Sequence, residues 1–92
     1  MGESFGVAAF RSRQQVMRMN DWFRKEGLKT SVVSTPREIS AGCGLSIRFD
    51  LKDLSSVRRA TTAARPSNMI GLYRVDAKNG QKSSLSVLTM RE

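Results

Sequence analysis

The order of apolar patterns along the chain predicts an α+β fold, a ferredoxin-like two-layer βαββαβ sandwich with room for an extra C-terminal edge strand. Two observations predict it. The order strand, helix, strand occurs twice, and such a unit is right-handed and parallel. The chain has only 92 residues, which favours one domain. Joining the two units through their middle strands puts both helices on one face of a sheet and leaves the other face open.

The first unit begins with a short apolar run. Phe5–Phe10 (FGVAAF) has the length of a strand that is buried on both faces. Ser12 follows as a helix N-cap, and apolar residues at helical spacing predict a helix over Arg13–Glu26 that ends at Gly27. Lys29–Ser34 (KTSVVS) is β-branched in its middle and predicts the second strand.

The second unit repeats this order. In Leu45–Phe49 (LSIRF), apolar residues alternate with Ser and Arg, which predicts a half-buried strand. Asp50 is a candidate N-cap for a second helix, whose apolar stripe ends near Ala64. Met69–Val75 (MIGLYRV) predicts the fourth strand.

The C-terminal segment predicts a strand that folds back on the sheet. Asn79-Gly80 is a strong type I′ hairpin turn signal, and alternating residues follow it from Leu85 to Thr89. We therefore divide the chain into a ferredoxin-like α+β domain over residues 1–76 and a C-terminal hairpin or extension of the same domain over residues 77–92.

The composition narrows the function classes. One cysteine without any histidine makes neither an internal disulfide nor a zinc site, and cysteine hydrolases usually need a histidine base. We expect no enzyme, no cofactor and no metal. No apolar run approaches the roughly 20 residues of a membrane span. We expect a cytoplasmic protein with no membrane contact. The net charge of +8 is spread along the chain, so a nucleic-acid partner is open but not favoured.

The connection between the second and third strands is longer than a plain hairpin needs. Hairpin loops take about two to five residues, whereas this connection runs from Thr35 to Gly44. Pro36 fixes its entry. Gly42 and Gly44 flank the single cysteine, Cys43, where they free the backbone and leave the sulfur sterically open.

Two interpretations of Cys43 stand side by side. Sulfur chemistry requires a thiolate, which nearby cations and converging backbone N–H groups stabilise. Arg37 and Arg48 are the candidate cations, and the amides of Gly44 and its neighbours, Gly42 among them, are candidate donors in a small anion-binding nest. Carrying a persulfide or perselenide is an exchange reaction and needs no histidine. A lone cysteine is, however, more often an inert residue of a turn.

The stretch TPREISAGCGLSIRF (Thr35–Phe49) resembles the signature of a small bacterial family of selenium/sulfur carrier-like proteins, which is marked by a TPRxxSxxCG motif. Its flanks resemble the family too, at Glu26-Gly27 and in GLYRV (Gly71–Val75). The resemblance implies that Cys43 bears the sulfur or selenium atom, and that Arg37 stabilises the anion. Further positions that match the motif are Thr35, Pro36, Ser40 and Gly44; Ser40 would donate to the anion or cap the loop.

Two hypotheses for function follow. In the first, the chain is a carrier or relay that holds a persulfide or perselenide on Cys43, and its partners are sulfur or selenium donor and acceptor proteins. In the alternative, it is a non-catalytic interaction or regulatory module, whose basic surface binds an acidic protein or nucleic acid while Cys43 only shapes the loop. Homodimerisation is compatible with both.

Overall fold

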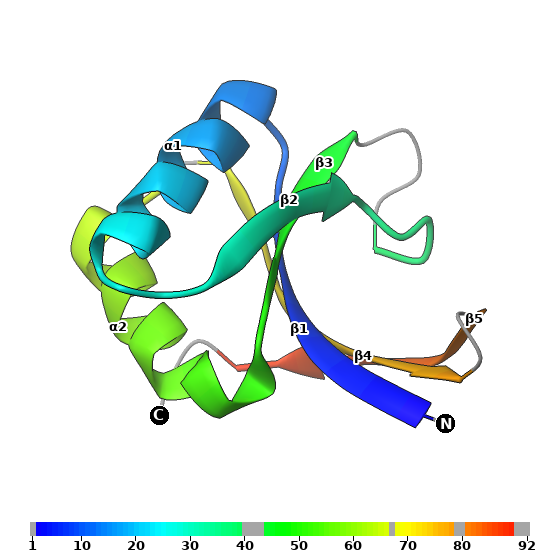
Figure 1. Cartoon of the computed structure of the whole chain (residues 1–92). Coiled ribbons are helices and arrows are strands. Elements are labelled where there is room, and N and C mark those ends of the chain that lie inside the picture. The colour runs from blue at the N-terminus through cyan, green and yellow to red at the C-terminus, as the bar shows by residue number, and fades with distance from the viewer. Residues whose placement is uncertain (1, 40–43, 67, 79–80, 90–92) are drawn as a thin grey trace.

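The computed structural model describes residues 2–39, 44–66, 68–78 and 81–89. These residues form two layers, an antiparallel five-stranded sheet and a pair of helices on one of its faces (Figure 1). In chain order the elements are β1 (Gly2–Phe10), α1 (Arg13–Lys25), β2 (Thr30–Ser34), β3 (Leu45–Phe49), the 3₁₀ turn η1 (Leu51–Asp53), α2 (Leu54–Ala64), β4 (Met69–Lys78) and β5 (Gln81–Leu88).

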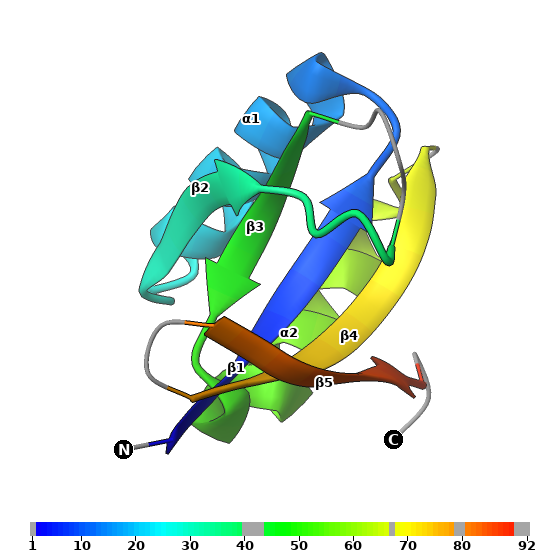
Figure 2. The same cartoon turned by 90° about the vertical axis from the view of Figure 1, so that its right-hand side faces the viewer.

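The strands lie in the order β2-β3-β1-β4-β5, and every neighbouring pair is antiparallel (Figure 2). The α+β class predicted from the sequence is confirmed. The exact ferredoxin-like arrangement stays a prediction, whereas the extra C-terminal edge strand that the sequence predicts is present as the fifth strand. That strand, β5, pairs with β4 at the edge. The predicted Asn79-Gly80 turn lies outside the described residues.

The first helix, α1, begins and ends at residues with a clear physical role. The Ser12 hydroxyl accepts a hydrogen bond from the Gln15 N–H at 3.3 Å, as the N-cap prediction requires. Gly27 follows α1 with a φ of 85°, a left-handed conformation that suits glycine. The second helical segment begins after Asp50 as predicted, because the Asp50 carboxylate accepts a hydrogen bond from the Lys52 N–H at 3.4 Å. It differs from the prediction in opening as the 3₁₀ turn η1 before α2 continues it.

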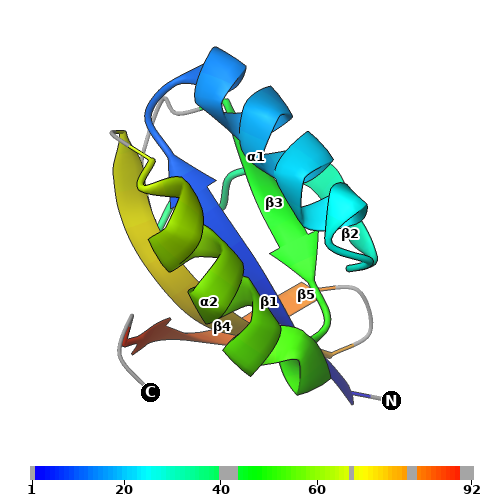
Figure 3. The same ribbon diagram turned by 90° about the vertical axis from the view of Figure 1, so that its left-hand side faces the viewer.

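The two helices lie side by side on the sheet (Figure 3), and a hydrogen bond links them. The Trp22 indole N–H of α1 donates to the Ala60 carbonyl of α2 at 3.0 Å. At the end of α2, Arg65 takes a left-handed backbone conformation with a φ of 49°. Neither helix within the described residues is long and apolar enough to cross a membrane.

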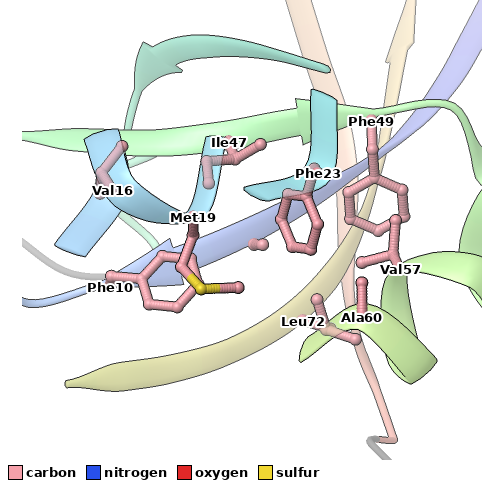
Figure 4. Packing of buried hydrophobic residues seen from close by; sticks show 10 residues of the cluster. Phe10, Val16, Met19, Phe23, Ile47, Phe49, Val57, Ala60 and Leu72 are labelled. Atoms are coloured by element: carbon pink, nitrogen blue, oxygen red, sulfur yellow. The ribbon is translucent and has the colours of Figure 1, made fainter. Parts of the chain in front are cut away.

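The core fills the space between the helices and the sheet (Figure 4). Gly6 of β1 and Phe49 of β3 are cross-strand partners, and the Phe49 ring lies where a Cβ on Gly6 would stand. The fully or almost fully buried core side chains come from both helices and from the strands β1, β3 and β4, and they include Phe10, Val16, Met19, Phe23, Ile47, Phe49, Val57 and Leu72.

A polar cluster joins β1, β4 and β5 near the N-terminal end of β1. The Asp76 carboxylate accepts hydrogen bonds from Ser4 of β1, Ser84 of β5 and Arg74 of β4. These hydrogen bonds, that of Ser4 first, lower the pKa of Asp76 from 3.8 to about 2. The cluster therefore stabilises the region where β1 and β4 extend beyond their predicted bounds.

Candidate functional site

The connection between β2 and β3 is closed at its base by one backbone hydrogen bond. The Thr35 N–H donates to the Gly44 carbonyl at 3.3 Å. This bond continues the β2–β3 ladder, in which Ser34 is the partner of Leu45. The segment that carries Cys43 is thus an excursion from two paired strands, and its two ends are held together.

A pair of buried hydroxyls reinforces the base of the loop. The side-chain oxygens of Thr35 and Ser46 lie 2.6 Å apart, and one donates to the other. Ser46 is 0% exposed and Thr35 is 9% exposed. Because a buried hydroxyl is costly without a partner, this contact favours one position for the start of the loop.

The loop then makes a single turn. The Ile39 N–H donates to the Pro36 carbonyl at 3.0 Å, so residues 36–39 form a hydrogen-bonded turn. Arg37 and Glu38 stand at its exposed corners, and Ile39 is half-buried. Arg37 makes no ion pair with any residue that the structure describes, which leaves its guanidinium available there.

This turn lies over the sheet on the side away from the helices (Figure 2). Pro36 and Glu38 line a hollow of about 480 Å³ together with Phe5, Arg48 and Val75 among others. The prediction of a wholly open second face is wrong.

Residues of this second face alternate along β1 with those of the helix-facing core. Val7 and Ala9 are fully buried, and Val75, which lies across from Phe5 of β1, is 2% exposed. Burial of apolar side chains beneath a loop stabilises the covered conformation. Phe5 and Val75 also line the hollow beside the turn at residues 36–39, so this part of the sheet lies next to the turn.

Arg48 is engaged away from the base of the loop. Its guanidinium lies 2.7 Å from the Glu3 carboxylate and 3.9 Å from the centre of the Phe5 ring. Arg48 is four residues beyond Gly44 on β3, a separation of roughly 13 Å along the strand. The structure places Arg48 against β1 and Arg37 on the turn, so the two predicted cations have different surroundings.

Gly44 differs from its predicted role in one respect. Among the described glycines only Gly27 has a positive φ, and a Cβ built on Gly44 meets nothing within 4 Å. The backbone of Gly44 therefore does not need glycine, and the space where a Cβ would stand is open. The other predicted site residues, Ser40, Gly42 and Cys43, lie outside the described residues.

Sequence reasoning missed Ser46 and Glu3 as partners of site residues. Ser46 occupies the polar face of the LSIRF strand, where alternation predicts exposure. It is nevertheless fully buried, and its hydroxyl meets that of Thr35, a contact between separate segments that a local pattern does not register. Glu3 precedes the predicted first strand, so its pairing with Arg48 depends on the unpredicted extension of β1.

Comparison with known proteins supplies the family. No curated protein and no solved structure matches the chain. The sequence does match the family described as "Putative Se/S carrier protein-like" over residues 5–65, well over half of its length. The matched range includes the whole connection from Thr35 to Gly44 and confirms the resemblance seen in the TPRxxSxxCG motif. The chain belongs to this selenium/sulfur carrier-like family.

Proposed function

We propose that this protein carries sulfur or selenium as a persulfide or perselenide on Cys43 and passes it to an acceptor protein. The observation that carries the proposal is the family match, which spans the motif that contains the cysteine. The anchored base of the loop supports it, because Gly44 is bonded covalently to Cys43 and hydrogen-bonded to Thr35. A carrier of this kind is a substrate-like shuttle and not an enzyme.

The proposed step is an exchange between sulfur atoms. The Cys43 thiolate attacks the outer sulfur of a donor persulfide, a new S–S bond forms on Cys43, and the S–S bond of the donor breaks. The donor leaves as a thiolate, so no external oxidant or reductant is required. Delivery to the acceptor repeats the same exchange in the opposite sense, and a perselenide reacts analogously.

Arg37 is the cation that the geometry favours for the anionic forms. It is exposed on the turn and makes no ion pair among the described residues, whereas Arg48 already pairs with Glu3. An exposed guanidinium lowers the free energy of a nearby thiolate modestly, because water screens the interaction. The amide of Gly44 and the hydroxyl of Ser40 are the further proposed donors to the anion.

Transfer from a defined donor tests the proposal. The reduced protein is mixed with glutathione persulfide and its intact mass is recorded. We expect the wild type to gain one sulfur atom, dithiothreitol to remove it, and Cys43→Ser to gain none. A wild type that reacts with iodoacetamide but never accepts sulfur would contradict the proposal and favour the interaction module.

The pH dependence of Cys43 alkylation by iodoacetamide tests the loop chemistry separately. We expect the midpoint of the rate profile to lie below the value of about 8.5 for a free cysteine. Arg37→Gln should move it upward, and Arg13→Gln, which removes the same charge from α1, should not. Arg48→Gln tests the sequence-based assignment of the second arginine. An ordinary midpoint that no variant moves would make Cys43 a turn residue.

A further inference from the structure

A groove crosses the helix layer on the side of the molecule opposite the loop. It lies between α1 and the C-terminal end of α2, the two helices that face the viewer in Figure 3. Its volume is about 460 Å³, and its lining includes Arg18 and Trp22 of α1 with Ala63, Arg65 and Pro66 at the end of α2. A hollow of this size accommodates one or two side chains of a partner.

The charge of the groove has one sign. Arg18 and Arg65 contribute two guanidinium groups, and the residues found to line it include no carboxylate. Neither arginine forms an ion pair with the residues that the structure describes. Two cations beside an apolar surface attract carboxylates and hold them by charge-assisted hydrogen bonds.

Trp22 gives the groove its apolar surface. Its side chain is 39% exposed, although its indole N–H is already satisfied by the Ala60 carbonyl. A partner would therefore contact the apolar carbon atoms of the indole ring rather than its N–H. Tryptophan and arginine are the residues most often found at the centres of binding surfaces.

The backbone of Arg65 adds an independent observation. A left-handed conformation is unfavourable for a residue with a side chain, whereas glycine adopts it freely. Arg65 keeps a guanidinium at this position in spite of that cost. Left-handed residues commonly end helices, usually as glycine, so what is unusual here is that the position keeps a charged side chain.

We infer that this groove binds an acidic protein segment in which carboxylates flank an apolar side chain. A second copy of the chain is a poor occupant, because each copy carries a net charge of +8. Nucleic acid is also a poor occupant, since duplex-binding proteins contact roughly 6–10 phosphates and the groove offers two cations. A partner on the helix layer leaves the opposite face, with the turn at residues 36–39, uncovered.

The single tryptophan of the chain provides a direct readout. Trp22 fluorescence is followed while an acetylated, amidated peptide of four glutamates around a central leucine is added. We expect a saturable blue shift, because the leucine covers the indole ring. The glutamine counterpart of the peptide should produce none, and replacing leucine by glycine should weaken binding.

Three variants locate the site. Arg18→Gln and Arg65→Gly should each weaken binding of the peptide by about tenfold. Arg13→Gln is the matched control, because it removes the same charge from an exposed position of α1 outside the groove, and it should change binding less than twofold. Cys43→Ser should bind like the wild type, which separates this test from that of the carrier chemistry.

Two results would overturn the inference. One is a peptide that leaves Trp22 fluorescence unchanged at low salt while the protein is folded. The other is equal weakening by Arg13→Gln and Arg18→Gln, together with tighter binding of a single-stranded oligonucleotide, because that pattern describes general attraction to polyanions.

Discussion

The hydroxyl pair at the base of the loop makes a prediction whose magnitude can be worked out. Thr35→Val keeps the shape of the side chain and removes its hydroxyl, and Ser46→Ala removes the other partner. Leaving a buried hydroxyl without its hydrogen bond costs about 1–3 kcal/mol. Replacing both partners by apolar groups is close to neutral, because nothing polar is then left buried.

The exposures of the two residues rank the single variants. In Thr35→Val the orphaned group is Ser46, which is 0% exposed, so the cost should lie near the upper end of that range. In Ser46→Ala the orphaned group is Thr35, which is 9% exposed and reaches some water, so the cost should be near 1 kcal/mol, the lower end. The double variant should cost less than the sum of the two.

Urea unfolding followed by circular dichroism measures all four proteins, and thermal unfolding checks them. For a domain of this size, 1 kcal/mol corresponds to a change in Tm of about 4–8 °C. Strict additivity would show that the two hydroxyls do not stabilise each other. A larger cost for Ser46→Ala than for Thr35→Val would refute the reasoning from burial.

Three further predictions concern other parts of the fold. Gly6→Ala should cost about 1–3 kcal/mol, because its methyl group would overlap the buried Phe49 ring, while Gly44→Ala, with open space at its Cβ, should be tolerated in the same urea titration. Arg65→Gly should raise the free energy of unfolding by about 0.5–1 kcal/mol, the left-handed penalty less the entropy cost of glycine, and an unchanged or lower Tm would contradict it. Hydrogen bonds lower the pKa of Asp76 from 3.8 to about 2. Their contribution to the free energy of unfolding should be present above pH 3.8 and lost as the pH falls towards 2. The Asp76→Asn variant should lack this acid-dependent loss of stability.

The elements that could be predicted from the sequence are those with a strong local pattern. Leu45–Phe49 has the predicted bounds because its apolar residues occupy every second position and all face the core on one side of the sheet. The start of α1 was predictable because Ser12 caps it. In the Phe5–Phe10 run, burial on both faces is confirmed for residues 7–10.

The parts that could not be predicted depend on contacts between distant segments. Gly2 to Ser4 has little intrinsic strand propensity, but it pairs with β4, and Ser4 contacts Asp76. The same holds at the site. Alternation places Arg48 on the second face, but only the extended β1 brings Glu3 and Phe5 to its guanidinium and engages it there.

The spacing of the family motif has a physical explanation in the base of the loop. The β2–β3 register places Thr35 opposite Gly44, and the same threonine reaches Ser46 with its hydroxyl. The first and last residues of the TPRxxSxxCG motif are therefore paired in space, which fixes the ends of the intervening chain. Because one end of that chain leads into the turn with Arg37 and the other is bonded to Cys43, its length limits how far the cation can lie from the sulfur. The stability of the fold depends on the hydrogen bonds at the base of the loop, whereas the proposed chemistry of Cys43 depends on the length of chain between the two ends of the loop.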